Sequence, residues 1–125
     1  MKHETIALSD AEWRIMQCLW RGGAPMSARE LTDALSGETA WGVHSVISFL
    51  KRMEAKGAVA ILDGRPIRYR AALDREEAVR QETRDLLSRV YGGEKLLMIQ
   101  CAVDAAPLSD AERDELIALL KGGKK

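Results

Sequence analysis

Cysteine is scarce in this chain of 125 residues, and the usual motifs of a metal or redox centre are missing with it. The two cysteines, Cys18 and Cys101, lie far apart in apolar stretches. We therefore expect buried free thiols in place of a disulfide or a metal site. No CxxC, HExxH, P-loop or GxGxxG motif occurs. These absences argue against an enzyme, and we expect neither a metal nor another cofactor.

Long apolar runs are missing as well. No stretch approaches the roughly 20 apolar residues that a membrane helix needs, and residues 1–13 contain no apolar signal-peptide core. We therefore expect a cytoplasmic protein without membrane insertion. Its 46% hydrophobic and 30% charged residues indicate a globular chain, either one medium domain or a compact domain with a smaller appendage.

Net charge is also absent, since 19 basic residues balance 19 acidic ones, but the charges are unevenly distributed. Residues 51–70 contain six basic side chains against only Glu54 and Asp63, whereas residues 74–125 contain 9 basic and 11 acidic groups. The six are Lys51, Arg52, Lys56, Arg65, Arg68 and Arg70. This asymmetry suits an anionic partner that one region meets, although an ordinary solvated surface would look the same.

Several helices are predicted, three of them by a capping box, in which a serine oxygen and a glutamate three residues later satisfy free N–H groups at the helix start. The motifs are Ser9-Asp-Ala-Glu12, Ser27-Ala-Arg-Glu30 and Ser109-Asp-Ala-Glu112. They predict helices over about residues 10–21, 28–35 and 110–120. A long helix over 74–91 and a short apolar helix over 94–105 are separated by Gly92-Gly93.

The predicted helix that ends at Gly57 has two distinct sides. Helical spacing places Val43, Val46, Leu50 and Met53 on an apolar stripe. Polar and basic side chains collect opposite this stripe. After the glycine, residues 58–62 and 67–71 read as two short strands around the turn Asp63-Gly-Arg-Pro66. In the second strand Ile67 and Tyr69 alternate with Arg68 and Arg70, so one side can pack on the helices while the other faces solvent or an anion.

Three helices followed by a hairpin is the order of a winged helix-turn-helix, so we expect a mainly α fold with a small β-hairpin. Residues 1–73 are predicted to form a winged-helix DNA-binding domain, and residues 74–125 a helical dimerisation domain. A helix fits the DNA major groove, and basic residues of a hairpin can neutralise neighbouring phosphates.

The predicted DNA-binding residues lie on the outward side of the third helix and on the hairpin. They are Trp41, His44, Ser45, Ser48, Lys51, Arg52, Arg65 and Arg68. His44 and Ser48 are candidates for base contacts, the cations for phosphate contacts. Trp41 either packs on a sugar or closes the helix entrance. Arg70 either binds phosphate or pairs with an acid of the long helix. Trp13 and Trp20 are expected in the core.

The C-terminal half is too apolar to face water alone, which predicts a partner. Since most oligomers are two-fold homodimers, a second copy is the simplest partner, and two recognition helices would then read an inverted repeat. The predicted dimerisation residues are Leu86, Val90, Leu96, Leu97, Ile99, Leu116 and Leu120. The alternative is that these helices fold back on the same chain.

Five stretches resemble the BlaI/MecI/CopY family of bacterial repressors. They are LSDAEWRIMQCLW at 8–20, SARELTDAL at 27–35, LKRMEAKGAV at 50–59, DGRPIRYRAALDREEAVR at 63–80 and YGGE at 91–94. The resemblance implies a homodimeric repressor of double-stranded operator DNA, with an N-terminal winged helix and a C-terminal helical dimerisation region. In some relatives a membrane sensor protease triggers cleavage of an Asn-Phe bond, and copper-responsive members have a Cys-x-Cys motif.

This chain departs from both induction schemes. The region of the Asn-Phe bond reads IQCAVDA, and the only cysteine in the C-terminal half is Cys101. Ile47 stands where related repressors often have a basic residue, so it touches a thymine methyl, or the operator differs, or other positions read the DNA. The expected function is sequence-specific repression by a homodimer. The alternative is a winged-helix protein-interaction module, with Trp41 and Ile47 as exposed anchors.

Overall fold

The computed structural model describes residues 6–122, which form two compact units that divide between Gln81 and Glu82. The first unit contains α1 (Asp10–Gly22), β1 (Met26–Ser27), α2 (Ala28–Ala34), α3 (Val43–Lys56), β2 (Val59–Leu62), β3 (Arg68–Ala71) and the start of α4 (Arg75–Arg89). The rest of α4, α5 (Lys95–Ala105) and α6 (Asp110–Leu120) belong to the second unit. The predicted division at residue 73 stays a prediction.

All three predicted capping boxes are present. The Ser9 hydroxyl accepts the Glu12 N–H at 3.2 Å, and the Glu12 carboxylate accepts the Ser9 N–H at 2.9 Å. The same reciprocal pair opens α2 at Ser27 and α6 at Ser109. Each box satisfies two backbone N–H groups that lack a partner within the helix, which is why the helix starts are where the sequence predicts them.

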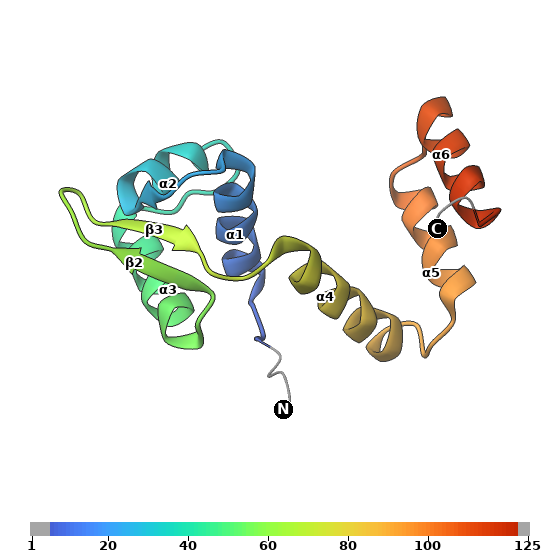
Figure 1. Cartoon of the computed structure of the whole chain (residues 1–125), viewed down its shortest axis with the longest axis horizontal. Coiled ribbons are helices and arrows are strands. Elements are labelled where there is room, and N and C mark those ends of the chain that lie inside the picture. Colours follow the sequence, from blue (N-terminus) through green and yellow to red (C-terminus); the bar gives the residue numbers. More distant parts are fainter. Residues whose placement is uncertain (1–5, 123–125) are drawn as a thin grey trace. The chain divides into compact units, whose positions relative to one another are not determined.

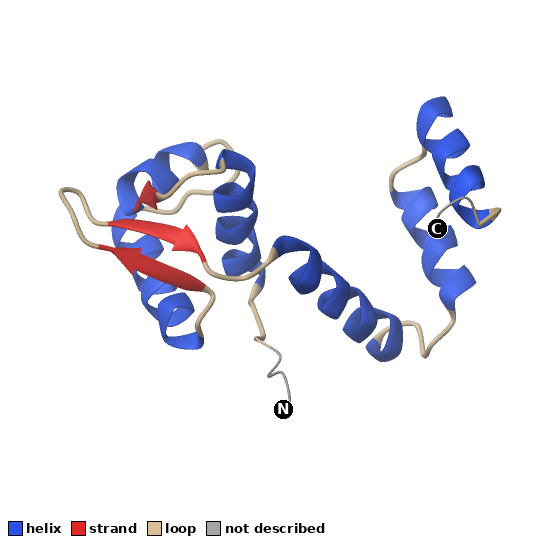
Figure 2. Ribbon diagram, viewed as in Figure 1, coloured by secondary structure: helices blue, strands red, loops and turns tan. Residues whose placement is uncertain are grey.

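The small sheet has three strands in the order β1-β3-β2, all antiparallel (Figure 2). The predicted hairpin is confirmed, with Ile61 opposite Tyr69 and Leu62 opposite Arg68. The sequence did not predict β1, in which Met26 pairs with Tyr69 and Ser27 with Arg68. This strand therefore joins the start of α2 to the wing, the name used here for β2, β3 and their turn.

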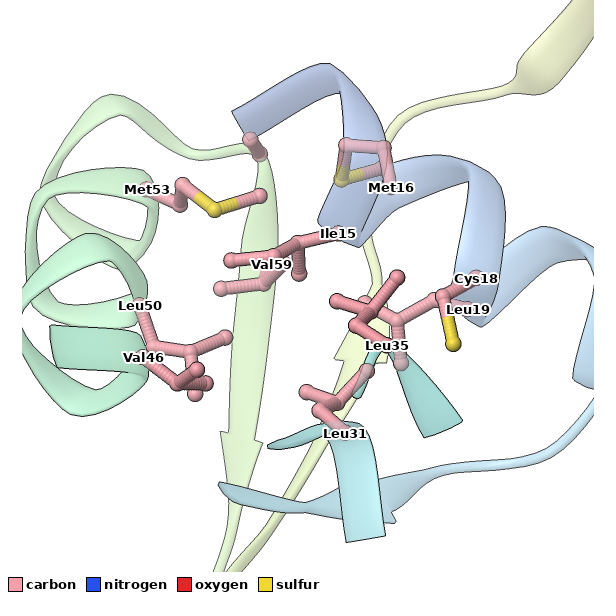
Figure 3. Close-up of a cluster of buried hydrophobic side chains, with 11 residues drawn as sticks. Ile15, Met16, Cys18, Leu19, Leu31, Leu35, Val46, Leu50, Met53 and Val59 are labelled. Atoms are coloured by element: carbon pink, nitrogen blue, oxygen red, sulfur yellow. The ribbon is translucent and has the colours of Figure 1, made fainter. Parts of the chain in front are cut away.

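The core lies between α1, α2, α3 and the sheet (Figure 3). Its members are Ile15, Met16, Cys18, Leu19, Leu31, Leu35, Val46, Leu50, Met53, Ala58 and Val59. The apolar stripe of α3 supplies three of them, as predicted. Trp20 packs against this cluster and donates its ring N–H to the carbonyl of Leu73 at 3.1 Å. Trp13 is half-buried, with its ring 6.1 Å from that of Trp20.

The helices α4, α5 and α6 differ from those of the core, because their residues are exposed or half-buried. None of the residues of α4, α5 and α6 is buried. Cys18 is a buried free thiol as expected, but the same expectation was wrong for Cys101, which is exposed. The sequence around Cys101 is apolar, but no described element covers this side of α5. None of the helices within residues 6–122 is long and apolar enough to cross a membrane.

Candidate nucleic-acid interface

The two sides of α3 are as different as the sequence predicts. Val46, Leu50 and Met53 are fully buried. The exposed side contains the predicted contact residues His44, Ser45, Ser48, Lys51 and Arg52. Gly42 precedes the helix without a side-chain cap, so the first N–H groups of α3 are left for water or an anion.

Trp41 and Ile47 differ from the rest of this set. Both are half-buried, so the expectation that they are exposed anchors was wrong. Trp41 packs against the core, and its ring centroid lies 5.0 Å from that of Phe49. The guanidinium carbon of Arg52 lies 5.5 Å from the centroid of the Phe49 ring. Of the two predicted roles of Trp41, this geometry supports packing against the start of α3 over packing on a DNA sugar.

Hydrogen bonds tie the connection from α2 to α3 to the end of α2 and to α1. Thr39 donates its N–H and its hydroxyl to the carbonyl of Leu35, at 2.9 and 3.2 Å. Glu38 accepts a hydrogen bond from Arg14 of α1 at 2.9 Å. These bonds fix the segment from which α3 starts, and with it the orientation of the exposed side of α3.

The wing places a second group of cations beside α3, which packs against β2. Its turn, residues 63–67, is exposed and projects beyond the helices (Figure 1). Arg65 lies in this turn, and Gly57 with a φ of 87° lets the chain pass from α3 towards β2. Tyr69 packs against the core, while Arg70 on the other side of β3 is exposed, which confirms the predicted alternation at these two positions. The prediction was wrong for Ile67, which lies in the turn before β3 and is 49% exposed.

Arg68 of β3 forms an ion pair with Glu30 of α2 at 3.6 Å. The backbone N–H of Ser27 and then the Arg68 guanidinium lower the pKa of the Glu30 carboxyl. Both side chains are about half exposed, so this pair stabilises the fold weakly and leaves Arg68 accessible to another anion. Arg70 is exposed, and both of its predicted roles stay predictions.

Lys56 does not belong to this surface. Its ammonium group pairs with Glu12 of α1 and donates to the carbonyl of Ala7 at 2.7 Å. Burial alone would raise the pKa of Glu12, but Lys56 and the Ser9 N–H outweigh it, so the pKa is lowered. The basic stretch of the sequence is therefore divided, with Lys56 in a structural ion pair and the other five cations at the surface.

We call the exposed side chains of α3 and the wing the α3–wing surface. It comprises His44, Ser45, Ser48, Lys51, Arg52, Arg65, Arg68 and Arg70. Arg68 is half-buried and the others are exposed. This surface contains five cations, whereas the exposed carboxylates of α3 and the wing are Glu54 and Asp63. Positive charge is therefore in excess, and the surface is chemically suited to a polyanion.

The predicted dimerisation residues form a separate set in α4, α5 and α6. Leu96 is 74% and Leu120 is 70% exposed, an unusual degree for leucine in a folded protein. Val90, Leu97 and Ile99 are also exposed, whereas Leu86 and Leu116 are half-buried. These side chains supply an apolar surface that no described residue buries.

Comparison with known proteins agrees with this arrangement. The model of the penicillinase repressor family matches residues 8–122. The methicillin resistance regulatory protein MecI of Mammaliicoccus sciuri is 22% identical over 121 residues, which cover 96% of this chain and 98% of MecI. MecI of Staphylococcus aureus strain N315 gives the same values. A solution structure of Bacillus licheniformis BlaI, in its monomeric form with the blaP half-operator, has a TM-score of 0.50 and 25% identity, covering 59% of this chain and 90% of that chain.

Proposed function

The chain belongs to the penicillinase repressor family, and we propose that it represses transcription as a homodimer bound to an inverted-repeat DNA operator. One observation carries the proposal: the exposed side of α3 and the wing present five cations, although the chain as a whole has no net charge. The likeness to a BlaI chain solved with a half-operator supports DNA as the anion. The bacterial cytoplasm would then be the site of action.

In this proposal α3 is the recognition helix and lies in the major groove. His44 and Ser48 lie in its first half, where such helices meet base edges. Ser45, Lys51 and Arg52 flank them and bind phosphates. The wing reaches the neighbouring backbone through Arg65, Arg68 and Arg70. Phosphate contacts fix the position on the duplex, and base contacts choose the sequence.

The exposed apolar side chains of the second unit support the homodimer. Leu96 and Leu120 would remain largely in water in a single chain, and a second copy brings the same apolar side chains to cover them. Two copies place two recognition helices on successive half-sites, which gives an operator with two-fold symmetry. Repression would then be steric, by occupation of the promoter.

Relief of repression requires its own mechanism. The chain has no Asn-Phe bond in the stretch Ile99–Ala105, so a sensor protease would have to cleave another bond. The single Cys101 lacks the second thiol of a Cys-x-Cys copper site. The protein-interaction alternative is weakened, because its two anchors, Trp41 and Ile47, are half-buried.

The test is footprinting on the DNA upstream of the protein's own gene, together with sequence selection from a random duplex pool. We expect protection of an inverted repeat whose half-sites are about one helical turn, or a multiple of it, apart. The absence of any protected or selected duplex at low salt would exclude operator binding and return the interaction module as the better proposal.

Two substitutions on α3 separate phosphate contacts from base contacts. Lys51→Ala should weaken binding to all duplexes about equally and reduce the slope of log affinity against log salt by about one. His44→Ala should instead change which operator variants are preferred. An unchanged slope removes Lys51 from the phosphate contacts, and uniform losses across sequences remove His44 from the base contacts.

A further inference from the structure

The exposed Arg52 guanidinium is connected to the core by two aromatic rings. It lies over the ring of Phe49, and that ring meets Trp41 at an angle of 58°. Both rings are half-buried and pack against the core. A cation over an aromatic face is attracted by the ring quadrupole, and a planar guanidinium can also stack on it.

The same chain of contacts continues backwards into the turn before α3. The backbone N–H of Trp41 donates to the Thr39 hydroxyl at 3.4 Å. This hydroxyl in turn donates to the backbone carbonyl of Leu35, a core residue. Contacts therefore run without interruption from the end of α2 to the guanidinium.

The neighbouring Lys51 provides a contrast on the same helix. It is exposed like Arg52, but among the described residues it has no ring contact and no ion pair. A long flexible side chain loses rotamer freedom when it binds, and a pre-positioned one loses less. Arg52 should therefore lose less rotamer freedom than Lys51 when it binds a partner.

We propose that Trp41 and Phe49 are positioning residues that hold Arg52 as a fixed phosphate-binding group, and that Trp41 does not itself contact DNA. The inference rests on the proposed function. Arg52 lies in the last turns of the 14-residue α3, beyond the residues that usually meet base edges, so a phosphate is its natural ligand. The guanidinium fork binds phosphate oxygens through two hydrogen bonds only in a defined orientation, which the Phe49 ring provides.

The experiment is a double-mutant cycle on the duplex that the wild-type protein selects from a random pool. Arg52→Ala should weaken binding about tenfold and reduce the salt slope by about one. Phe49→Leu should weaken it about threefold with the wild-type slope, because the charge stays but its position is lost. In the Arg52→Ala background, Phe49→Leu should have no further effect. In the Lys51→Ala background, it should retain its full effect.

Equal effects of Phe49→Leu in both backgrounds would overturn the inference, since a purely structural role of the ring does not depend on Arg52. An Arg52→Ala variant with wild-type affinity would overturn it as well. Failure to select any duplex would overturn the proposed function itself, which is a different result.

Because Phe49 packs on the core, a second pair of variants avoids any change to folding. Arg52→Lys keeps the charge but loses the planar fork, and it should bind several-fold more weakly at the wild-type salt slope. Arg75→Lys in α4, the same exchange at an exposed position outside the α3–wing surface, should leave affinity unchanged. Wild-type affinity of Arg52→Lys would overturn the role of the aromatic support.

Discussion

The two units of this chain start a helix with the same four residues, Ser-Asp-Ala-Glu, and use it in opposite ways. At residues 9–12 the motif opens α1, which buries Ile15, Met16 and Leu19 among others. At residues 109–112 it opens α6, in which none of the residues is buried. Local sequence therefore decides that a helix starts, and the tertiary partners decide whether its apolar side is covered.

This difference has an energetic meaning. Burying one large apolar side chain contributes roughly 1.5–3 kcal/mol relative to leaving it in water. The first unit obtains this contribution within one chain, through the cluster of α1, α2, α3 and the sheet. In α4, α5 and α6 the same residue types remain exposed or half-buried, so their contribution is available to a partner. The first unit covers its apolar side chains within one chain, whereas the second leaves many of its own exposed.

The substitution with the largest expected effect tests the buried core of the first unit. Leu50→Ala removes a fully buried side chain and should lower the free energy of unfolding of the first unit by about 3 kcal/mol. Leu119→Ala in α6, at a position 60% exposed, should cost less than about 0.5 kcal/mol in this measurement. Urea unfolding followed by tryptophan fluorescence is suitable, because Trp13, Trp20 and Trp41 all lie in the first unit. Similar losses for both leucines would contradict the contrast.

Much of the first unit could be predicted from the sequence because its signals are local. Capping boxes, the apolar stripe of α3 and the alternation in β3 each involve residues a few positions apart, and the elements they predict end within one or two residues of the observed bounds. The order of the elements then indicated the winged helix.

What the sequence did not reveal depends on contacts between distant segments. The two residues of β1 form a strand only because β3 is beside them. Lys56 is one of the six cations of the basic stretch, and its pairing with Glu12 requires that α1 and the end of α3 meet. The support of Arg52 by Phe49 is local, at a spacing of three residues, and was visible in principle as a helical aromatic–arginine pair.

The next prediction tests the exposed apolar side chains of the second unit. Leu96→Lys places a charge in the proposed dimer contact and should weaken self-association about 30-fold, which is roughly 2 kcal/mol. The tryptophan-detected stability of the first unit should not change. Ile67→Lys in the wing is the matched control, since this side chain is also exposed, and it should leave the monomer–dimer equilibrium as it is. Sedimentation equilibrium measures both. A dimer unaffected by Leu96→Lys would assign association to another surface.

The smallest expected effect compares the two identical motifs directly. Glu12 and Glu112 both complete a capping box, but only Glu12 also pairs with a lysine, and its side chain is 3% exposed. Glu12→Gln should cost the first unit about 1 kcal/mol, because it leaves Lys56 without its anion while that ammonium group keeps some contact with water. Glu112→Gln, at an exposed box, should not change the tryptophan-detected stability measurably.

The pH dependence shows whether the charge of Glu12 is responsible. Because its pKa in the folded chain lies below the ordinary value of 4.5, Glu12 contributes stability that is complete above this value and is lost as the pH falls through the folded pKa. The stability difference between wild type and Glu12→Gln should therefore be constant near neutral pH and shrink below about pH 4.5. Other carboxyls with a lowered pKa, such as Glu30, are present in both proteins and cancel in the difference. A difference that stays the same down to pH 3 would mean that the glutamine shape, and not the lost charge, causes the destabilisation, and the two Ser-Asp-Ala-Glu motifs would then differ in packing alone.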